Sequence, residues 1–480
     1  MRTTADSRRR WVAVATAGAV TLAGVLTVAA GGSSAAEGQQ ALDPATCDRQ
    51  SRPESDIPGR VPAEDFESGR AAKGYTCNVR QVAHYGETGG LKVHRFADSS
   101  GHVCAFYDST ILFPTDALTN GVTGLGTYVM DMTDAARPVR TATLTSPAML
   151  SPHESLVLSE KRGLLVAVLG NALTAPGQVD VYDVSRDCRT PQLLSSTPVG
   201  VLGHESGLSP DGRTFYASSL VGHVMTAVDL TDPRAPRPLS TLVGHNFHGL
   251  RVSRDGNYLY AADLGRPDDQ RLVNGGLKVL DVSAIQARKP LAQAKVVAHL
   301  TWRDAAVPQV AEPMRIDGRD YLLMVDEFQT LPNDPTFSYR PENHAGVARI
   351  INVDDPHRPY EVSQLRLAVH TEANRAGEQQ DDPGAKNPVG GYAAHYCSVP
   401  RRVDPSLAAC AYIGSGLRIF DISDPEAPRE VGYFNKPAPT GGYAMAQPAW
   451  DVPRRQVWFT DVDQGFFAVR LSDRMWPRDL

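Results

Sequence analysis

Several familiar sequence features are missing from this chain of 480 residues. It contains no nucleophile elbow, no Walker loop and no dinucleotide fingerprint, so the best-known signatures of hydrolases, P-loop enzymes and nicotinamide enzymes are absent. No apolar run after residue 36 approaches the ~20 residues that cross a bilayer. There is no basic run outside the N-terminus, and the formal net charge is -6. These charges argue against nucleic acid or an anionic membrane as the partner.

Cysteine is scarce, and its six positions are Cys47, Cys77, Cys104, Cys188, Cys397 and Cys410. Their wide and irregular spacing does not suggest a zinc ribbon and fits disulfides in an oxidising compartment. Cys397 and Cys410 are expected on neighbouring strands of one hairpin, so they are the predicted disulfide. The other pairings stay open, because six cysteines can be joined in many ways.

The first 36 residues have the pattern of a signal peptide. Arg8, Arg9 and Arg10 precede an apolar stretch over residues 11–30, and small residues at 34–36 offer a cleavage site before Glu37. The mature protein is therefore expected to be secreted and extracellular. Residues 7–12 (SRRRWV) also resemble a twin-arginine export signal, with an ordinary secretion signal as the alternative. No cysteine stands near the cleavage site, so no lipoprotein anchor is expected.

One unit recurs along most of the chain: an apolar strand, an acidic anchor at its end, a turn, and a proline about seven residues later. The clearest copy runs from Gly416 to Phe434 (GLRIFDISDPEAPREVGYF). The anchors of the copies are Asp131, Asp183, Asp229, Asp281, Asn352, Asp421 and Arg470. Periods of roughly 50 to 70 residues admit four short strands each, the size of one propeller blade. The aspartate anchors are expected to accept hydrogen bonds from amides of the turn.

This unit resembles the LVIVD repeat of secreted bacterial β-propellers, most closely in GLRIFDISDPEAP, GGLKVLDVS and AVDLTDPRAP. The resemblance covers roughly Gly74 to Pro477, although Asn352 and Arg470 depart from the acidic anchor. It implies an all-β fold, a seven-bladed β-propeller. Such a motif identifies a scaffold and not a chemistry.

Three parts are expected: a signal peptide at residues 1–36, an extended N-terminal arm at 37–73, and the seven-bladed β-propeller at 74–480. The last repeat shows strands near Gln447–Asp451, Gln456–Asp461 and Gly465–Leu471 and lacks a fourth. Asn78 to Tyr85 matches the outer strand of a unit and has no anchor of its own. We predict that this N-terminal strand pairs with the C-terminal blade, which closes the ring and leaves no free sheet edge.

Aligning the repeats on their Asp-Gly turns brings one position of each innermost strand into register. In the second to seventh blades it is occupied by His153, His204, His248, Glu312, His395 and Gln447. Innermost strands line the axial channel of a propeller, so these side chains are expected at one mouth of the channel. Imidazoles and a carboxylate on one axis suit a transition metal such as zinc, copper or iron. The predicted metal ligands are His153, His204, His248, Glu312 and His395.

Four further residues are expected to orient these ligands or to line the pocket: Glu154, Glu205, His245 and Gln447. Glu154 and Glu205 each follow a histidine directly, and neighbours on a strand point to opposite faces. They are therefore not required to bind the same ion. His245, three residues before His248, is an alternate ligand.

The functional alternatives stay open at this point. The histidines can hold a metal ion, line a metal-free pocket for a small ligand, or form hydrogen bonds with the backbone of the next blade. A metal site can belong to an enzyme acting on an extracellular small molecule. A non-catalytic scaffold for protein or cell-wall material is the second class. Asp326 and Glu327 are interpreted as a solvated strand end, with calcium binding as the alternative, and Asp381 and Asp382 as solvated charges of a loop. The expected partner is a small molecule or an extracellular protein, and the chain is expected to be a monomer.

Overall fold

The structure is a computed structural model. It describes residues 40–109, 124–169, 177–200, 203–219, 223–267, 272–273, 275–328, 344–387, 390–438, 444–478 and 480. Contacts divide the chain into residues 1–38 and 39–480, and every described helix and strand lies in the second part. The expected signal peptide lies outside the described residues. Within these ranges no helix has the length and apolar character needed to cross a membrane.

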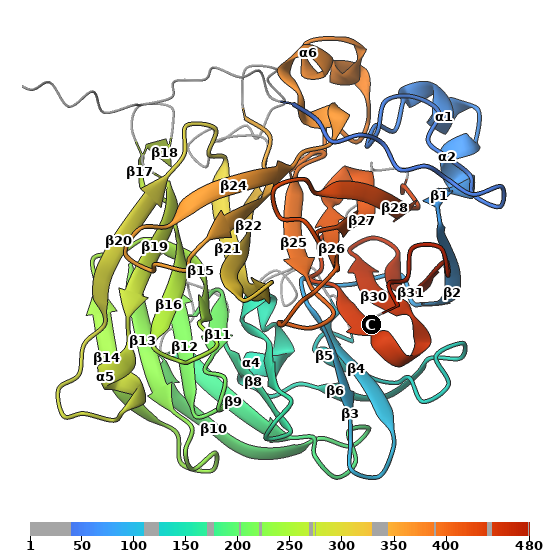
Figure 1. The fold of residues 1–480 in the computed structure, drawn as a ribbon. Coiled ribbons are helices and arrows are strands. Elements are labelled where there is room, and N and C mark those ends of the chain that lie inside the picture. The colour runs from blue at the N-terminus through green and yellow to red at the C-terminus, as the bar shows by residue number, and fades with distance from the viewer. Residues whose placement is uncertain are drawn as a thin grey trace, which may run out of the picture. The chain divides into compact units, whose positions relative to one another are not determined.

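Seven antiparallel blades follow one another around a central axis, so the chain forms the predicted seven-bladed β-propeller (Figure 1). The first three are β3–β6 (Val93–Ala97, Val103–Asp108, Thr127–Asp131, Val139–Leu144), β7–β10 (Val157–Ser159, Leu164–Val168, Gly177–Asp183, Gln192–Gly200) and β11–β14 (Ser206–Leu208, Thr214–Ser219, Val224–Asp229, Arg237–Val243). The fourth and fifth are β15, β16, β19 and β20 (Phe247–Val252, Tyr258–Asp263, Gly276–Asp281, Lys295–Thr301) and β21–β24 (Val307–Ile316, Arg319–Glu327, Ala348–Asn352, Tyr360–Leu365). The sixth and seventh contain β25–β28 (Ala394–Ser398, Leu407–Tyr412, Gly416–Asp421, Arg429–Asn435) and β29–β31 (Ala449–Asp451, Gln456–Asp461, Gly465–Leu471).

The ring closes through the N-terminal strand, as predicted. Strand β2 (Val79–Tyr85) pairs antiparallel with β31 and completes the seventh blade. Strand β1 (Tyr75–Cys77) adds a fifth strand to the sixth blade by pairing with β28. The N-terminal segment therefore joins the last two blades, and both of these sheets use it to cover an edge.

The aspartate anchors perform the predicted structural role. In each case the carboxylate accepts a hydrogen bond from the backbone N–H two residues later, at 2.8–3.0 Å: Asp131, Asp183, Asp229, Asp281 and Asp421. Asn352 does the same with its amide oxygen, which accepts from the Asp354 N–H at 3.2 Å. The turn therefore needs an acceptor rather than a charge, and this explains why asparagine is tolerated at that position.

The apolar core lies between the blades. One cluster joins Val166 and Val181 of the second blade to Phe215 of the third. Another joins the seventh blade to the first, where the rings of Tyr107 and Phe466 stack at 5.4 Å. Because each sheet buries its faces against its neighbours, the innermost strands can carry polar side chains toward the axis.

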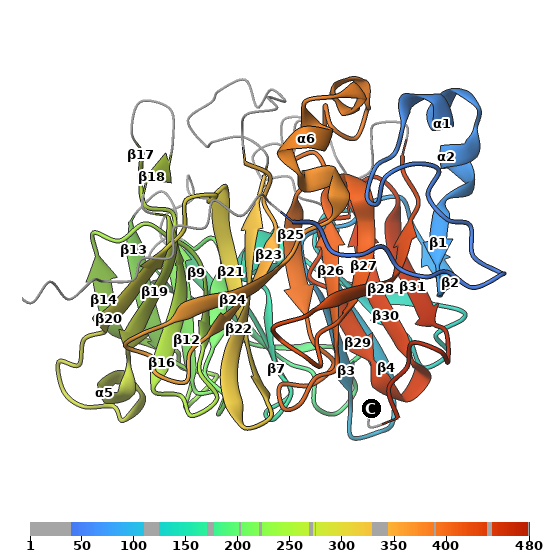
Figure 2. The ribbon, with the colours of Figure 1, turned by 45° about the horizontal axis from the view of Figure 1, so that its top comes forward.

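Short helices gather on one face of the ring (Figure 2). They are α1 (Ala63–Glu67), α2 (Arg70–Lys73), η2 (Ala368–His370), α6 (Glu372–Arg375) and η3 (Glu378–Asp381). Residues 40–74 pack on the connection between the fifth and sixth blades: the Val61 N–H donates to the Tyr392 hydroxyl, and the Arg60 Nε to Asp382 Oδ2 at 2.8 Å. The interpretation of Asp382 as solvated is therefore wrong, because this pairing buries it completely.

Three disulfides cross-link the described residues. Cys397 and Cys410 face each other on β25 and β26 and form the predicted bridge. The others join Cys47 to Cys77 and Cys104 to Cys188. The remaining elements are α4 (Pro147–Leu150), η1 (His153–Ser155), β17 (Arg266–Pro267), β18 (Leu272–Val273), α5 (Ser283–Gln286), η4 (Ile413–Ser415) and η5 (Val452–Arg454).

Candidate functional site

Bulges at the start of three innermost strands set the direction of the axial side chains. One extra residue interrupts the pairing of β15, β21 and β25, at His248, Gln309 and His395 respectively. A bulge re-aims the side chain it carries, and here these three polar side chains are buried near the axis. Gly249 permits the close packing of β15 on β21, because a Cβ at this position would lie 2.3 Å from the carbonyl oxygen of Gln309.

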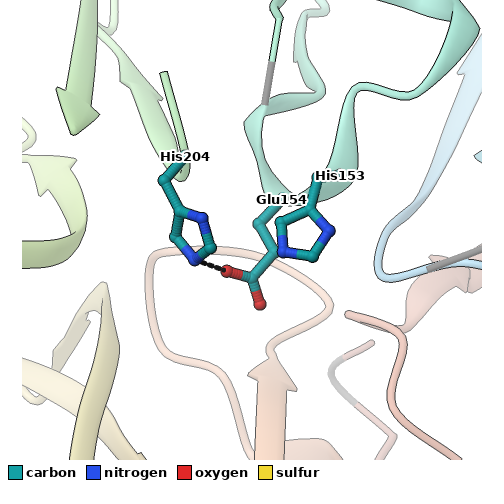
Figure 3. Close-up of side chains that lie close together, drawn as sticks. All are labelled: His153, Glu154 and His204. Atoms are coloured by element: carbon teal, nitrogen blue, oxygen red, sulfur yellow. Dashed lines mark ion pairs between the residues drawn. The ribbon is translucent and has the colours of Figure 1, made fainter. Parts of the chain in front are cut away.

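The second blade presents two site residues from a turn instead of a strand. His153 has φ 52°, in the left-handed region that costs a non-glycine residue about 1–2 kcal/mol, and begins the 3₁₀ turn η1. Strand alternation does not apply in this turn. His153 and Glu154 therefore lie together, with the Glu154 carboxylate between the imidazoles of His153 and His204 (Figure 3).

Glu154 is the centre of the cluster. Its Oε2 lies 3.0 Å from Nε2 of His204 and 3.6 Å from Nε2 of His248. These two nitrogens are 3.2 Å apart, and the rings of His153 and His204 have their centroids at 4.8 Å. Three ligand atoms from three blades thus form a small triangle beside the axis.

Glu327 supplies a second carboxylate, which the sequence interpretation treated as a solvated strand end. It is the last residue of β22 and only 2% exposed. Its Oε1 lies 3.1 Å from Nε2 of His248, and its Oε2 lies 2.9 Å from Nε2 of His395. Since β22 runs antiparallel to β21, its end lies at the mouth where the innermost strand begins. The antiparallel pairing of first and second strands is therefore the sequence signal that points to Glu327. Asp326 is buried too, against Arg349 and Trp302.

The electrostatics of the cluster keep its carboxylates anionic. Burial opposes ionisation of Glu154, but His248 and the other histidines outweigh it and hold the pKa of this carboxyl well below its ordinary value. Burial also disfavours the His248 imidazolium, yet Glu154 and Glu327 raise the pKa of His248 to about 9. Burial lowers the pKa of His153 to about 3, so this imidazole is neutral, the form in which histidine binds a metal.

Glu205 lies in a different group on the axis. Its carboxylate accepts hydrogen bonds from Arg251 Nη1 at 2.9 and 3.0 Å and from the Lys92 ammonium. The Tyr396 hydroxyl donates to the same carboxylate at 3.4 Å. The side chains of Lys92 and Glu205 are at most 1% exposed. The buried Glu205 carboxylate is therefore paired with cationic side chains of the protein itself.

Glu312 and Gln447 belong with this second group. Glu312 pairs with Arg251 at 3.4 Å and accepts from Arg402 Nε at 2.9 Å, while Gln447 Oε1 accepts from Arg251 Nη2 at 3.1 Å. His245 stacks on Phe247 with ring centroids 5.1 Å apart. The structure thus brings His153, Glu154, His204, His248 and His395 together and places Glu205, His245, Glu312 and Gln447 in other contacts.

Gln309 occupies the axial position of the fifth blade that the repeat alignment gave to Glu312. Its amide Nε2 donates to Glu154 Oε1 at 2.9 Å, and the side chain is fully buried. The alignment was three residues off because it counted back from the turn, and β21 is ten residues long. Nothing in the local sequence marks Gln309, since strand pairing decides where a bulge falls.

Comparison with known families identifies one copy of the repeat. The LVIVD repeat family matches residues 410–436, which include the second half of β26 and all of β27 and β28. No curated protein sequence matches the chain. A hydrazine synthase structure from Kuenenia stuttgartiensis shares 12% identity over 81% of this chain and 97% of that one, with a TM-score of 0.49. The periplasmic gluconolactonase of Pseudomonas aeruginosa shares 16% identity over 73% and 93%, with a TM-score of 0.46.

Similarity at this level carries no conclusion about function, and the fold is established by the sheet topology. The chain is a seven-bladed β-propeller that carries an LVIVD repeat in its sixth blade.

Proposed function

We propose that this protein is a secreted propeller that binds a transition-metal ion, zinc, copper or iron, at the axis. The ligands are the imidazoles of His153, His204 and His248 and the Glu154 carboxylate. Neutral imidazole and carboxylate are suitable donors for these metals, and His248, whose pKa is raised to about 9, must release its proton when the metal binds. The three disulfides agree with secretion, because they persist in oxidising compartments.

The spacing of the donor atoms carries this proposal. Atoms bound to one ion at about 2.1 Å lie about 3 to 3.5 Å from each other. The triangle of Glu154 Oε2, His204 Nε2 and His248 Nε2 has edges of 3.0, 3.2 and 3.6 Å. An ion therefore fits all three atoms with little movement.

Hydrogen bonding is the alternative for these atoms. His204 Nε2 can donate to Glu154 Oε2 at 3.0 Å and His248 Nε2 to Glu327 Oε1 at 3.1 Å. That arrangement leaves the two Nε2 atoms 3.2 Å apart without a proton between them, whereas an ion binds the lone pairs of both. The proposal assigns this position to the ion.

An ion at this position would act as a Lewis acid toward a small extracellular molecule or a bound water. The His204 side chain is 16% exposed, whereas those of Glu154 and His248 are 2% and 5% exposed. The ion would thus be shielded by protein on most sides, a setting in which charge stabilisation is strong.

The test is elemental analysis of protein purified without a histidine tag, before and after titration with Zn²⁺, Cu²⁺ or Fe²⁺. We expect at least one bound equivalent, and a His204→Ala variant that folds normally but loses an equivalent. The matched control, His245→Ala, should keep the full metal content. Less than ~0.1 equivalent in the wild type, with no uptake on titration, would refute the proposal and leave the interaction scaffold as the better interpretation.

A further inference from the structure

We infer that the axial site holds two metal ions, the second bound by His395, Glu327 and the remaining oxygen of Glu154. This inference rests on the proposed function, since it adds an ion to the same cluster. The second group of donor atoms shares only Glu154 with the first: His395, Glu327 and Glu154 offer three atoms that all lie within 4.8 Å of one another.

The two oxygens of each carboxylate face different imidazoles. Glu154 directs Oε2 toward His204 and Oε1 toward His395, whose Nε2 lies 3.4 Å away. Glu327 directs Oε1 toward His248 at 3.1 Å and Oε2 toward His395 at 2.9 Å. Each carboxylate is therefore placed as a bridge between a first position, near His204 and His248, and a second position, near His395.

The surroundings fix His395 and Glu154 in this arrangement. Nδ1 of His395 lies 2.6 Å from the carbonyl oxygen of Met445, which can only accept, so Nδ1 carries a proton and Nε2 faces the carboxylates. A backbone or carboxylate acceptor on the far nitrogen is the usual support of a metal-binding histidine. Gln309 donates to Glu154 Oε1 and holds the second oxygen toward His395.

The two groups use different oxygens of Glu154. His395 Nε2 approaches Oε1 of Glu154, whereas His204 and His248 approach Oε2. Ions bridged by carboxylates in two-metal sites are about 3.5 to 4 Å apart. Two carboxylates that span the same pair of positions suit that separation.

Stoichiometry and X-ray absorption on the full-length secreted protein test this inference. With Zn²⁺ or Co²⁺ alone as the probe, we expect two equivalents per chain and metal–metal scattering at about 3.5 to 4 Å. Changing His395→Ala should remove one equivalent and abolish the metal–metal scattering. The control His245→Ala should retain both.

The possible outcomes separate the two claims. No bound metal would overturn the proposed function and with it the pair. One equivalent in the wild type, without metal–metal scattering, would overturn the pair while the metal-binding function stands. Two equivalents retained in His395→Ala would show that the second position is elsewhere. Absorption data on the wild type keep the inference testable even if a variant fails to fold.

Discussion

Two polar groups lie on the same axis and solve the burial of charge differently. The histidine cluster, which we call the upper group, contains Glu154 and Glu327 with four imidazoles. The second group, which we call the lower group, contains Glu205 and Glu312 with Lys92, Arg251 and Arg402. Arginine and lysine bring their own charge, so the lower group is complete without a ligand. Imidazoles can exchange a proton for a metal ion, so the upper group can bind a metal ion. We therefore expect the lower group to form a structural layer and the upper group a binding layer.

The largest effect is expected from breaking the lower group with Glu205→Gln. This change leaves Lys92 and Arg251 buried beside a neutral amide, and removing one partner of a buried ion pair costs about 3–5 kcal/mol. Urea unfolding of the metal-free protein measures the loss. Glu154→Gln, the same change in the upper group, should cost less under these conditions. Equal losses for the two variants would contradict the division into layers.

The next effect concerns metal affinity. Glu154→Gln removes the central ligand and the carboxylate that approaches three imidazoles, so we expect the affinity for Zn²⁺ to fall at least ~100-fold while circular dichroism shows an intact sheet. Titration calorimetry measures the affinity. Unchanged affinity in this variant would place the metal away from Glu154.

A smaller loss of affinity is expected from Gln309→Leu. The leucine fills similar space but cannot donate to Glu154 Oε1, and lost support of a ligand typically lowers metal affinity ~10–100-fold. Gln447→Leu is the matched control, because Gln447 bonds Arg251 in the lower group. If both variants bind metal equally well, Gln309 does not position the ligand.

The last prediction concerns the pH dependence of the lower group. Burial lowers the pKa of Lys92 to about 8, from 10.5 in an unfolded chain. Between these values the unfolded chain holds a proton that the folded protein has released, so this residue makes stability rise with pH. The free energy of unfolding of the wild type, relative to Lys92→Met, should therefore increase between pH 8 and 10. A flat difference across this window would show that Lys92 stays protonated beside Glu205.

The repeat made the fold predictable to the level of single hydrogen bonds. Each blade is a local structure of about 50 residues with its own turn signal, and the carboxylates of Asp131 and Asp421 bond the turn amides as expected. The closing strand at Asn78–Tyr85 was predictable because a ring cannot leave one blade short of a strand. The Cys397–Cys410 bridge followed from the same strand assignment.

The cluster was predictable only in part. Four histidines recur at the starts of blades, and such positions must meet at one mouth of the channel. Glu327 could not be found from the first strands, since it comes from the end of a second strand. The choice between Glu312 and Gln309 depended on strand length and on a bulge, which the sequence does not display.

By itself the sequence determined the number of blades, their order and the residue types available at the axis, because these follow from local strand and turn preferences repeated along the chain. Only the tertiary structure decided which side chains meet, because bulges, the left-handed turn at His153 and the packing of neighbouring blades shift side chains by one or more positions. A donor set that needs distances near 3 Å is sensitive to a shift of this size, whereas the propeller is not.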